Sequence, residues 1–156
     1  MRAKSDTQQG GGNVLEIKLK QIVPGLKHID SAHEGEWIDL RAAEDVDLEP
    51  FEYRKIRLGV AMQLPDGYEA IMAPRSSTYS KWGIIMACSI GIIDNSFNGD
   101  NDEWSFPAIS LKRTKIHKND RICQFRIVRS QPDCSIHVVD RLGNEDRGGF
   151  GSTGSR

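Results

Sequence analysis

The sequence predicts an all-β domain, a barrel or sandwich with one short helix. Apolar residues alternate with polar ones in several short runs, and turn residues separate these runs at short intervals, which is typical of small all-β folds. The chain has 156 residues and no internal repeat. We therefore expect a single domain, spanning residues 14–141, that is large enough to bury a core.

The predicted strands follow a polar leader. Residues 1–13 contain three consecutive glycines and no apolar pattern, so we expect them to be disordered. Alternating apolar runs then occupy residues 15–19, 56–64, 123–127 and 136–138. Turn signals lie at residues 24–25, 65–67, 98–99, 118–120 and 143–144. Each alternating run predicts a strand with one buried face.

One stretch, residues 76–83, predicts a helix of one or two turns. Hydroxyl residues begin this stretch and Gly83 ends it. Arg75 directly precedes it, and the free N–H groups at the start of a helix favour phosphate. A simple capped turn without a ligand is the alternative interpretation.

We expect residues 142–156 to form a flexible arm, because four of the seven residues from Gly148 to Gly154 are glycine. The arm also carries an aromatic ring, an arginine and two hydroxyl groups, which suit stacking on a flat ring and binding of an anion. From composition alone, a frayed terminus explains the arm equally well. The spacing of its glycines matches the dinucleotide-binding fingerprint, but that motif opens a helix after a strand, and neither is predicted here.

Composition argues against several classes of function. The net charge of −1 gives no reason to expect a nucleic-acid polymer as partner, and no apolar run is long enough to span a bilayer. The N-terminus lacks the pattern of a signal peptide. Three widely spaced cysteines are expected to be reduced thiols of a cytoplasmic protein. No two of the four histidines have a metal-ligand spacing, which argues against a protein-held zinc ion.

Several single residues have chemical potential but also plain interpretations. Asp94 ends an apolar run and precedes Phe97 by three residues. Taken alone, Asp94 is most often a turn-capping residue and Phe97 a core residue. Asp39 and Gln124 likewise fit surface or turn positions.

Five short segments, taken together, resemble a known family. They lie, in this order, at residues 39–42, 74–77, 91–99, 120–124 and 148–154. Their order and separations resemble the five motifs of the trimeric deoxyuridine triphosphatases (dUTPases). The resemblance covers the chain from about residue 14 to residue 154 and implies a dUTPase-like β-barrel or jelly-roll fold.

The resemblance implies hydrolysis of dUTP to dUMP and pyrophosphate, with water attacking the α-phosphorus and Asp94 as the general base. An aspartate with a pKa of about 3.9 is ionised at neutral pH and can accept the proton. Backbone groups of residues 87–93 would hold uracil, and Phe97 would lie against the deoxyribose. The base-binding residues implied in this hairpin are Cys88, Gly91, Ile92 and Ile93.

The resemblance also implies a phosphate site and an assembly. The phosphate-binding residues implied are Arg75, Ser76, Ser77 and Gln124. Asp39 would orient the site or a magnesium-bound water, and Mg²⁺ would sit on the triphosphate without a direct protein ligand. Phe150 would stack on uracil as a lid, while Gly151, Ser152 and Thr153 would complete the arm's contacts with the substrate. The implied assembly is a homotrimer whose sites are built from all three subunits.

The chain departs from the family pattern at three positions. Phe97 replaces the usual tyrosine, Ser77 stands where glycine is usual, and Cys88 stands where many members carry asparagine. Residues 100–104 form a longer and more acidic link than usual, to which the sequence assigns no role.

The arginine of the arm is also displaced. In the family it usually lies two residues further from the glycine pair, at the position of Glu145 here. Either Arg147 or Arg141 is therefore expected to reach the phosphates.

Three other functions compete with this interpretation. A dCTP deaminase resembles dUTPases in fold, but it would favour a catalytic glutamate. It also lacks the combination of residues 91–94 with a glycine-rich end. A dUTP-responsive regulatory binding protein belongs to a different class, and the intact Asp94 argues for catalysis instead. A structural β-barrel leaves the ordered set of five segments unexplained.

Overall fold

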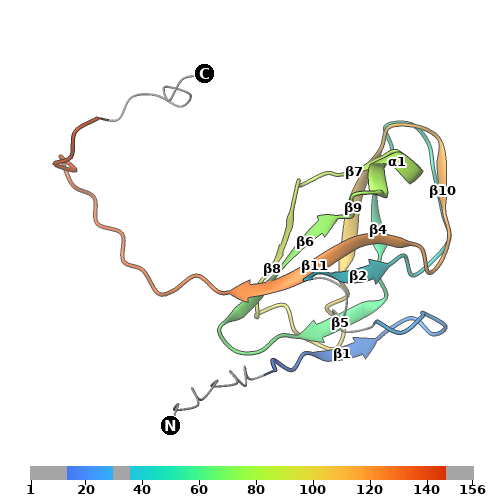
Figure 1. The fold of residues 1–156 in the computed structure, drawn as a ribbon, viewed down its shortest axis with the longest axis horizontal. Coiled ribbons are helices and arrows are strands. Elements are labelled where there is room, and N and C mark those ends of the chain that lie inside the picture. The colour runs from blue at the N-terminus through green and yellow to red at the C-terminus, as the bar shows by residue number, and fades with distance from the viewer. Residues whose placement is uncertain (1–13, 30–35, 147–156) are drawn as a thin grey trace, which may run out of the picture.

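The computed structural model describes residues 14–29 and 36–146, and the fold is all-β as predicted (Figure 1). In these ranges the strands form four antiparallel sheets. The largest sheet has the strand order β2 (Ile38–Arg41), β11 (Arg121–Arg129), β6 (Tyr68–Pro74) and β8 (Gly91–Ile93). A second sheet has the order β4 (Tyr53–Arg57), β9 (Ser105–Ser110) and β7 (Ile84–Met86). Two strand pairs complete the fold: β1 (Lys18–Gln21) with β5 (Val60–Gln63), and β3 (Val46–Leu48) with β10 (Thr114–Ile116).

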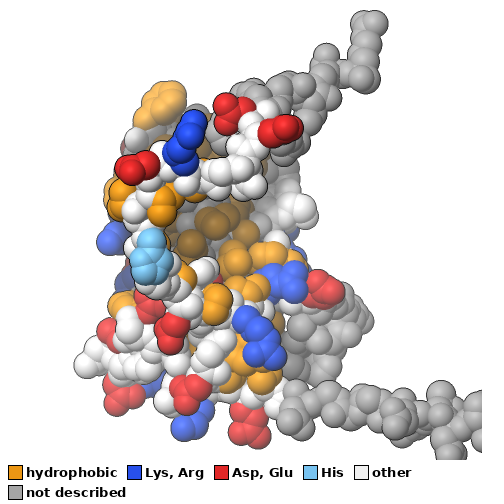
Figure 2. Space-filling view, turned by 90° about the vertical axis from the view of Figure 1, so that its left-hand side faces the viewer, with side chains coloured by type: hydrophobic (Ala, Val, Ile, Leu, Met, Phe, Trp, Pro, Cys, Tyr) orange, Lys and Arg blue, Asp and Glu red, His pale blue; other side chains and the backbone are white. Residues whose placement is uncertain are grey.

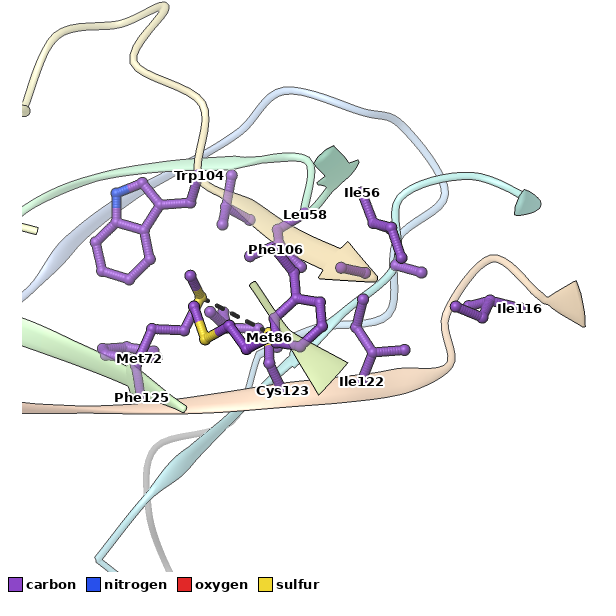
Figure 3. Close-up of a cluster of buried hydrophobic side chains, with 14 of the residues drawn as sticks. Ile56, Leu58, Met72, Met86, Trp104, Phe106, Ile116, Ile122, Cys123 and Phe125 are labelled. Carbon is purple, nitrogen blue, oxygen red and sulfur yellow. Dashed lines mark hydrogen bonds between the residues drawn. The ribbon is translucent and has the colours of Figure 1, made fainter. Parts of the chain in front are cut away.

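The core lies between the inner faces of these sheets. Along β9, Phe106, Ala108 and Ser110 are buried while the residues between them are half-buried, which is the period of a strand with one face in the core. Figure 3 shows Phe106 between β9 and β11, among the apolar side chains that fill this space. Trp104 and Phe125 meet edge to face across the core, with ring centroids 5.2 Å apart.

The apolar run at residues 56–64 is two strands and not the single strand predicted. β4 ends at Arg57 and β5 begins at Val60, so the chain passes from one sheet to another at Gly59. Gly59 has a positive φ of 68°, which glycine adopts without steric cost. Leu58 and Val60 are both buried, so the alternation continues across the break. The sequence pattern therefore does not reveal that one strand ends and another begins.

The predicted helix is confirmed as α1 (Thr78–Trp82), and Gly83 ends it in the left-handed conformation. Ser77 makes no capping bond with its side chain. Instead, the Thr78 hydroxyl accepts a hydrogen bond from the Arg75 N–H at 2.9 Å and donates one to the Ile122 carbonyl at 2.8 Å. The hydroxyl at the start of the helix therefore fixes it to β11.

The strand predicted at residues 136–138 does not form in this chain. Ile136 and Val138 are 88% and 99% exposed, and the segment after β11 runs away from the body (Figure 1). An alternating run needs a neighbouring strand to pair with, and the described part of the chain offers this segment none. The predicted leader 1–13 and residues 147–156 of the predicted arm lie outside the described residues.

Two further findings concern the whole described chain. In residues 14–29 and 36–146, no helix is long and apolar enough to cross a membrane. The three cysteines are not paired with one another, as expected, and burial of Cys123 raises the pKa of its thiol far above the usual range.

Candidate active site

Asp94 follows the end of β8 in a tight turn. Its Oδ1 atom accepts hydrogen bonds from the Ser96 hydroxyl and from the Ser96 N–H, the latter at 2.8 Å. The Phe97 N–H donates to the Asp94 carbonyl at 3.2 Å, which closes the turn. The Ser96 hydroxyl, followed by the two backbone N–H groups, holds the pKa of Asp94 below its usual value. The exposed carboxyl group is therefore ionised at neutral pH.

A cavity of about 610 Å³ lies beside Asp94. The residues predicted to hold the nucleoside line it: Cys88, Gly91, Ile92, Ile93 and Phe97. Its walls are mainly apolar, as a site for a flat ring requires. Figure 2 views the molecule from the side on which β8 lies in Figure 1, and hydrophobic side chains line a hollow at the centre of this face.

Gly91 lets the backbone approach the floor of this cavity. A Cβ atom there would lie 3.0 Å from Met72 Cε and 3.1 Å from Met86 Cε, closer than ordinary contact. β8 is also the last strand of its sheet and pairs only with β6 among the described residues. Its outer edge therefore presents backbone N–H and C=O groups that a ligand can use.

Asp39, on β2, lies between two arginines. Its Oδ1 atom accepts from Arg75 Nε at 2.5 Å, and its Oδ2 atom accepts from Arg121 Nη1 at 2.9 Å. The Asp39 and Arg75 side chains are about a quarter exposed, which shields this ion pair partly from water. In the described chain the terminal nitrogens of Arg75 have no partner, so they are free to bind an anion.

The other predicted phosphate ligands lie near this ion pair. Ser76 and Ser77 lie between Arg75 and α1, with Ser76 exposed. On β11, the Gln124 amide donates to the Pro74 carbonyl at 3.2 Å, so Gln124 is adjacent to the residue that precedes Arg75. Arg75 and its neighbours thus form one polar group at one end of β6.

A single chain does not bring this group to Asp94. Arg75 follows Pro74 at the end of β6, whereas Ile93, which precedes Asp94, pairs with Ala70 near the other end. About five residues of strand, or roughly 17 Å, separate the two groups along the sheet. These two separate groups of candidate site residues, around Asp94 and around Arg75, are called the half-sites below.

Three residues of these half-sites are not among those predicted from the sequence: Ser96, Arg121 and Trp104. Ser96 has a local signal, since a serine two residues after an aspartate can bond its side chain. Arg121 contacts Asp39 only because β11 pairs with β2, and this register is not a local property of the sequence. Trp104 lies in the acidic link to which the sequence assigns no role.

The residues predicted on the arm cannot be placed. Arg147, Phe150, Gly151, Ser152 and Thr153 lie outside the described residues, while Arg141 is described and exposed. Within the described residues, no group of three or more histidine, cysteine, aspartate or glutamate side chains could hold a metal ion.

Comparison with known proteins decides the family. The dUTPase family model matches residues 37–154. The chain belongs to the dUTPase family. It is 54% identical to an SPbeta prophage-derived deoxyuridine 5'-triphosphate nucleotidohydrolase of Bacillus subtilis, over 91% of this chain and 100% of the relative. It is 34% identical to a Thermobifida fusca deoxyuridine 5'-triphosphate nucleotidohydrolase, over 90% of this chain and 79% of the relative.

Solved dUTPases share the fold. A mutant Staphylococcus bacteriophage 80alpha dUTPase with dUpNHpp superposes with a TM-score of 0.74 at 22% identity, covering 89% of this chain and 98% of the other. A mutant dUTPase from phage phi11 of S. aureus, described with a structural Mg(II) ion, gives a TM-score of 0.68 at 19% identity. It covers 81% of this chain and 98% of the other. These similarities support an all-β, jelly-roll-like fold for this chain.

Proposed function

We propose that this dUTPase-family chain hydrolyses dUTP to dUMP and pyrophosphate, with Asp94 as the general base. The observation that carries the proposal is the position of the Asp94 carboxylate at a mainly apolar cavity of about 610 Å³, where the Ser96 hydrogen bonds hold the pKa of Asp94 below its usual value. In the described chain, Asp94 Oδ2 accepts no hydrogen bond, so it is available to hold a water molecule. The hydrogen bonds from Ser96 hold Asp94 Oδ1 in place, and they therefore fix the orientation of the carboxylate.

In the proposed reaction, the water oxygen forms a bond to the α-phosphorus while Asp94 takes its proton. The bond between the α-phosphorus and the α,β-bridging oxygen breaks, and pyrophosphate leaves with the electron pair. Mg²⁺ enters as the magnesium complex of dUTP and neutralises charge on the triphosphate. The free guanidinium nitrogens of Arg75 would bind the phosphates, together with Ser76, Ser77 and Gln124.

The cavity would select the nucleoside. The free edge of β8 offers backbone groups that can match the donors and acceptors of uracil, and the tight packing at Gly91 limits the room for larger bases. Phe97, which is 43% exposed, offers a ring face to the deoxyribose. Phe150 would then cover the base, and the rest of the arm would cover the phosphates.

We infer that a complete site needs more than one copy of the chain, in a homotrimer. The separation of Asp94 from Arg75 along β6 supports this inference, because neither residue can reach the other within one chain. The exposed Ile136 and Val138 support it as well, since apolar side chains on an extended segment are typical of a surface that another copy covers.

A substrate panel tests the proposal. Purified protein with magnesium should release pyrophosphate from dUTP and act far less on dTTP, dCTP or UTP. Release of ammonia from dCTP would show a deaminase, and absence of dUTP turnover would refute the hydrolase.

Replacement of Asp94 tests the role of the base. The Asp94→Asn variant should turn over dUTP roughly 10²–10⁴-fold more slowly, because the amide cannot take the proton. Binding of dUpNHpp, measured by calorimetry, should change little. Asp100→Asn is the matched control, since Asp100 is exposed and contacts Lys20 instead of the cavity. Near-normal turnover by Asp94→Asn would remove Asp94 from this role.

A further inference from the structure

Arg75 is held at its backbone as well as at its side chain. Its N–H donates to the Thr78 hydroxyl at 2.9 Å, while its guanidinium Nε donates to Asp39 Oδ1. The side chain is only 21% exposed, so both contacts are partly shielded from water. The two ends of the residue are therefore fixed independently of each other.

Thr78 is a buried polar residue whose hydroxyl has two partners. It is 0% exposed, and its hydroxyl donates to the Ile122 carbonyl at 2.8 Å while it accepts from the Arg75 N–H. One hydroxyl thus joins the end of β6 to β11. A valine has nearly the same shape, but it would leave a buried N–H and a buried carbonyl without this partner.

β11 is irregular at the point where it meets Thr78. Its register with β2 shifts between Arg121 and Cys123, and its register with β6 begins only at Cys123. Ile122 and Cys123 are consecutive and both 0% exposed, and Figure 3 shows their side chains on the same side of β11. These are the features of a β-bulge, in which one extra residue interrupts the ladder. Ile122 has no partner in either register, and its carbonyl bonds Thr78 instead.

The bulge also carries the group that orients the Arg75 side chain. Arg121, the residue before Ile122, donates from Nη1 to Asp39 Oδ2 at 2.9 Å, and Asp39 Oδ1 accepts from Arg75. The backbone and the guanidinium of Arg75 are thus each connected, through one intermediate residue, to two adjacent residues of β11. A shift of Arg75 relative to β11 would break one of these connections.

We propose that Thr78 is a positioning residue for the phosphate contact of Arg75. Its hydroxyl holds the Arg75 backbone where the guanidinium can meet Asp39 and still present its free nitrogens to the phosphates. A donor that is already in place binds without the cost of ordering a mobile side chain. The inference rests on the proposed function, because it takes Arg75 as a phosphate ligand.

Removal of the hydroxyl gives the first test. Thr78→Val should weaken binding of dUpNHpp, measured by calorimetry, roughly tenfold, because Arg75 loses its fixed position. Binding of deoxyuridine, which has no phosphate, should stay unchanged. Thr78→Ser keeps the hydroxyl and should bind both ligands as the wild type does. Thr78→Ala takes the place of Thr78→Val where the latter does not fold.

Ser110→Ala is the matched control for loss of a buried hydroxyl. Ser110 is 0% exposed, and its hydroxyl donates to the Lys112 carbonyl instead of a residue of either half-site. This variant should lose stability but keep the affinity for dUpNHpp. Equal weakening by Ser110→Ala and Thr78→Val would overturn the proposal, as would an unchanged affinity of Thr78→Val or a loss of affinity in Thr78→Ser.

A double-mutant cycle with Arg75 shows whether Thr78 acts through this residue. In an Arg75→Ala background, Thr78→Val should have little further effect on dUpNHpp binding, because the side chain that it positions is absent. Additive losses would show that Thr78 acts by another route and would refute the inference alone. Absent dUTP turnover by the wild type would instead refute the proposed function.

Discussion

Ser96 controls the charge of Asp94, because its hydroxyl and N–H both bond the same carboxylate oxygen. These bonds favour the ionised form, so the pKa of Asp94 is lowered from an ordinary value of 3.8. A carboxyl group whose pKa is lower in the folded state stabilises the fold at pH values above its ordinary pKa. Both this stabilisation and the negative charge are lost as the pH falls through the pKa of the folded state. The proposed base is therefore ionised throughout the physiological range.

The Ser96→Ala variant tests this control. Loss of the hydroxyl should raise the pKa of Asp94 toward its ordinary value, so the acid limb of kcat/KM for dUTP should move to higher pH. The neutral-pH rate should fall much less than in Asp94→Asn. The profile is measured only where circular dichroism shows that the protein is folded. An acid limb that coincides with that of the wild type would contradict the role given to Ser96.

At this scale, site residues are predicted from the resemblance of whole segments and not from single-residue signals. Asp94 and Phe97 are recognised because residues 91–99 form one of the five ordered segments, although each residue alone has a plainer interpretation, and both lie at the cavity. Arg121 is not recognised, because its bond to Asp39 depends on the pairing of two strands that lie far apart in the chain. Trp104 has no sequence signal that separates a core tryptophan from one that lines a site.

At the scale of elements, Gly59 allows the chain to leave one sheet and enter another. Its φ is positive, and a Cβ atom there would lie 2.5 Å from Leu26 Cδ1. Gly59→Ala should therefore lower the free energy of unfolding by about 2–4 kcal/mol, from backbone strain and overpacking together. Urea unfolding measures this change.

Gly67→Ala is the matched control for this prediction. Gly67 also has a positive φ, but a Cβ atom there would meet nothing within 4 Å. Its replacement should cost only the backbone term, about 1 kcal/mol. Equal losses for the two variants would show that close packing at Gly59 does not contribute.

The strands and the helix show how much of the fold could be predicted from the sequence. All-β architecture, β11 and the short helix follow from alternation, turn residues and a glycine stop, which are local signals. The break at Gly59 is missed because buried residues continue on both sides of it. The run at residues 136–138 has the right period for a strand, but its side chains are exposed. A strand needs a neighbouring strand to pair with, and the local sequence does not show whether one is present.

At the scale of the whole molecule, the two half-sites predict complementation between copies. Asp94→Asn and Arg75→Ala should each be nearly inactive alone. Co-expression with two different tags should give a population that regains up to about a quarter of wild-type activity, the chance that one copy supplies Asp94 and another Arg75 at a given site. The regained activity should follow the doubly tagged fraction. No activity in that fraction would place both residues of a site on one chain.

The proposed attack on the α-phosphorus is tested most directly by one isotope measurement. The wild-type protein hydrolyses dUTP with magnesium in water enriched in ¹⁸O, and mass spectrometry locates the label in the products. We predict one ¹⁸O atom in dUMP and none in pyrophosphate, because the water oxygen bonds to the α-phosphorus. Label in pyrophosphate, or no formation of dUMP, would contradict the proposed reaction.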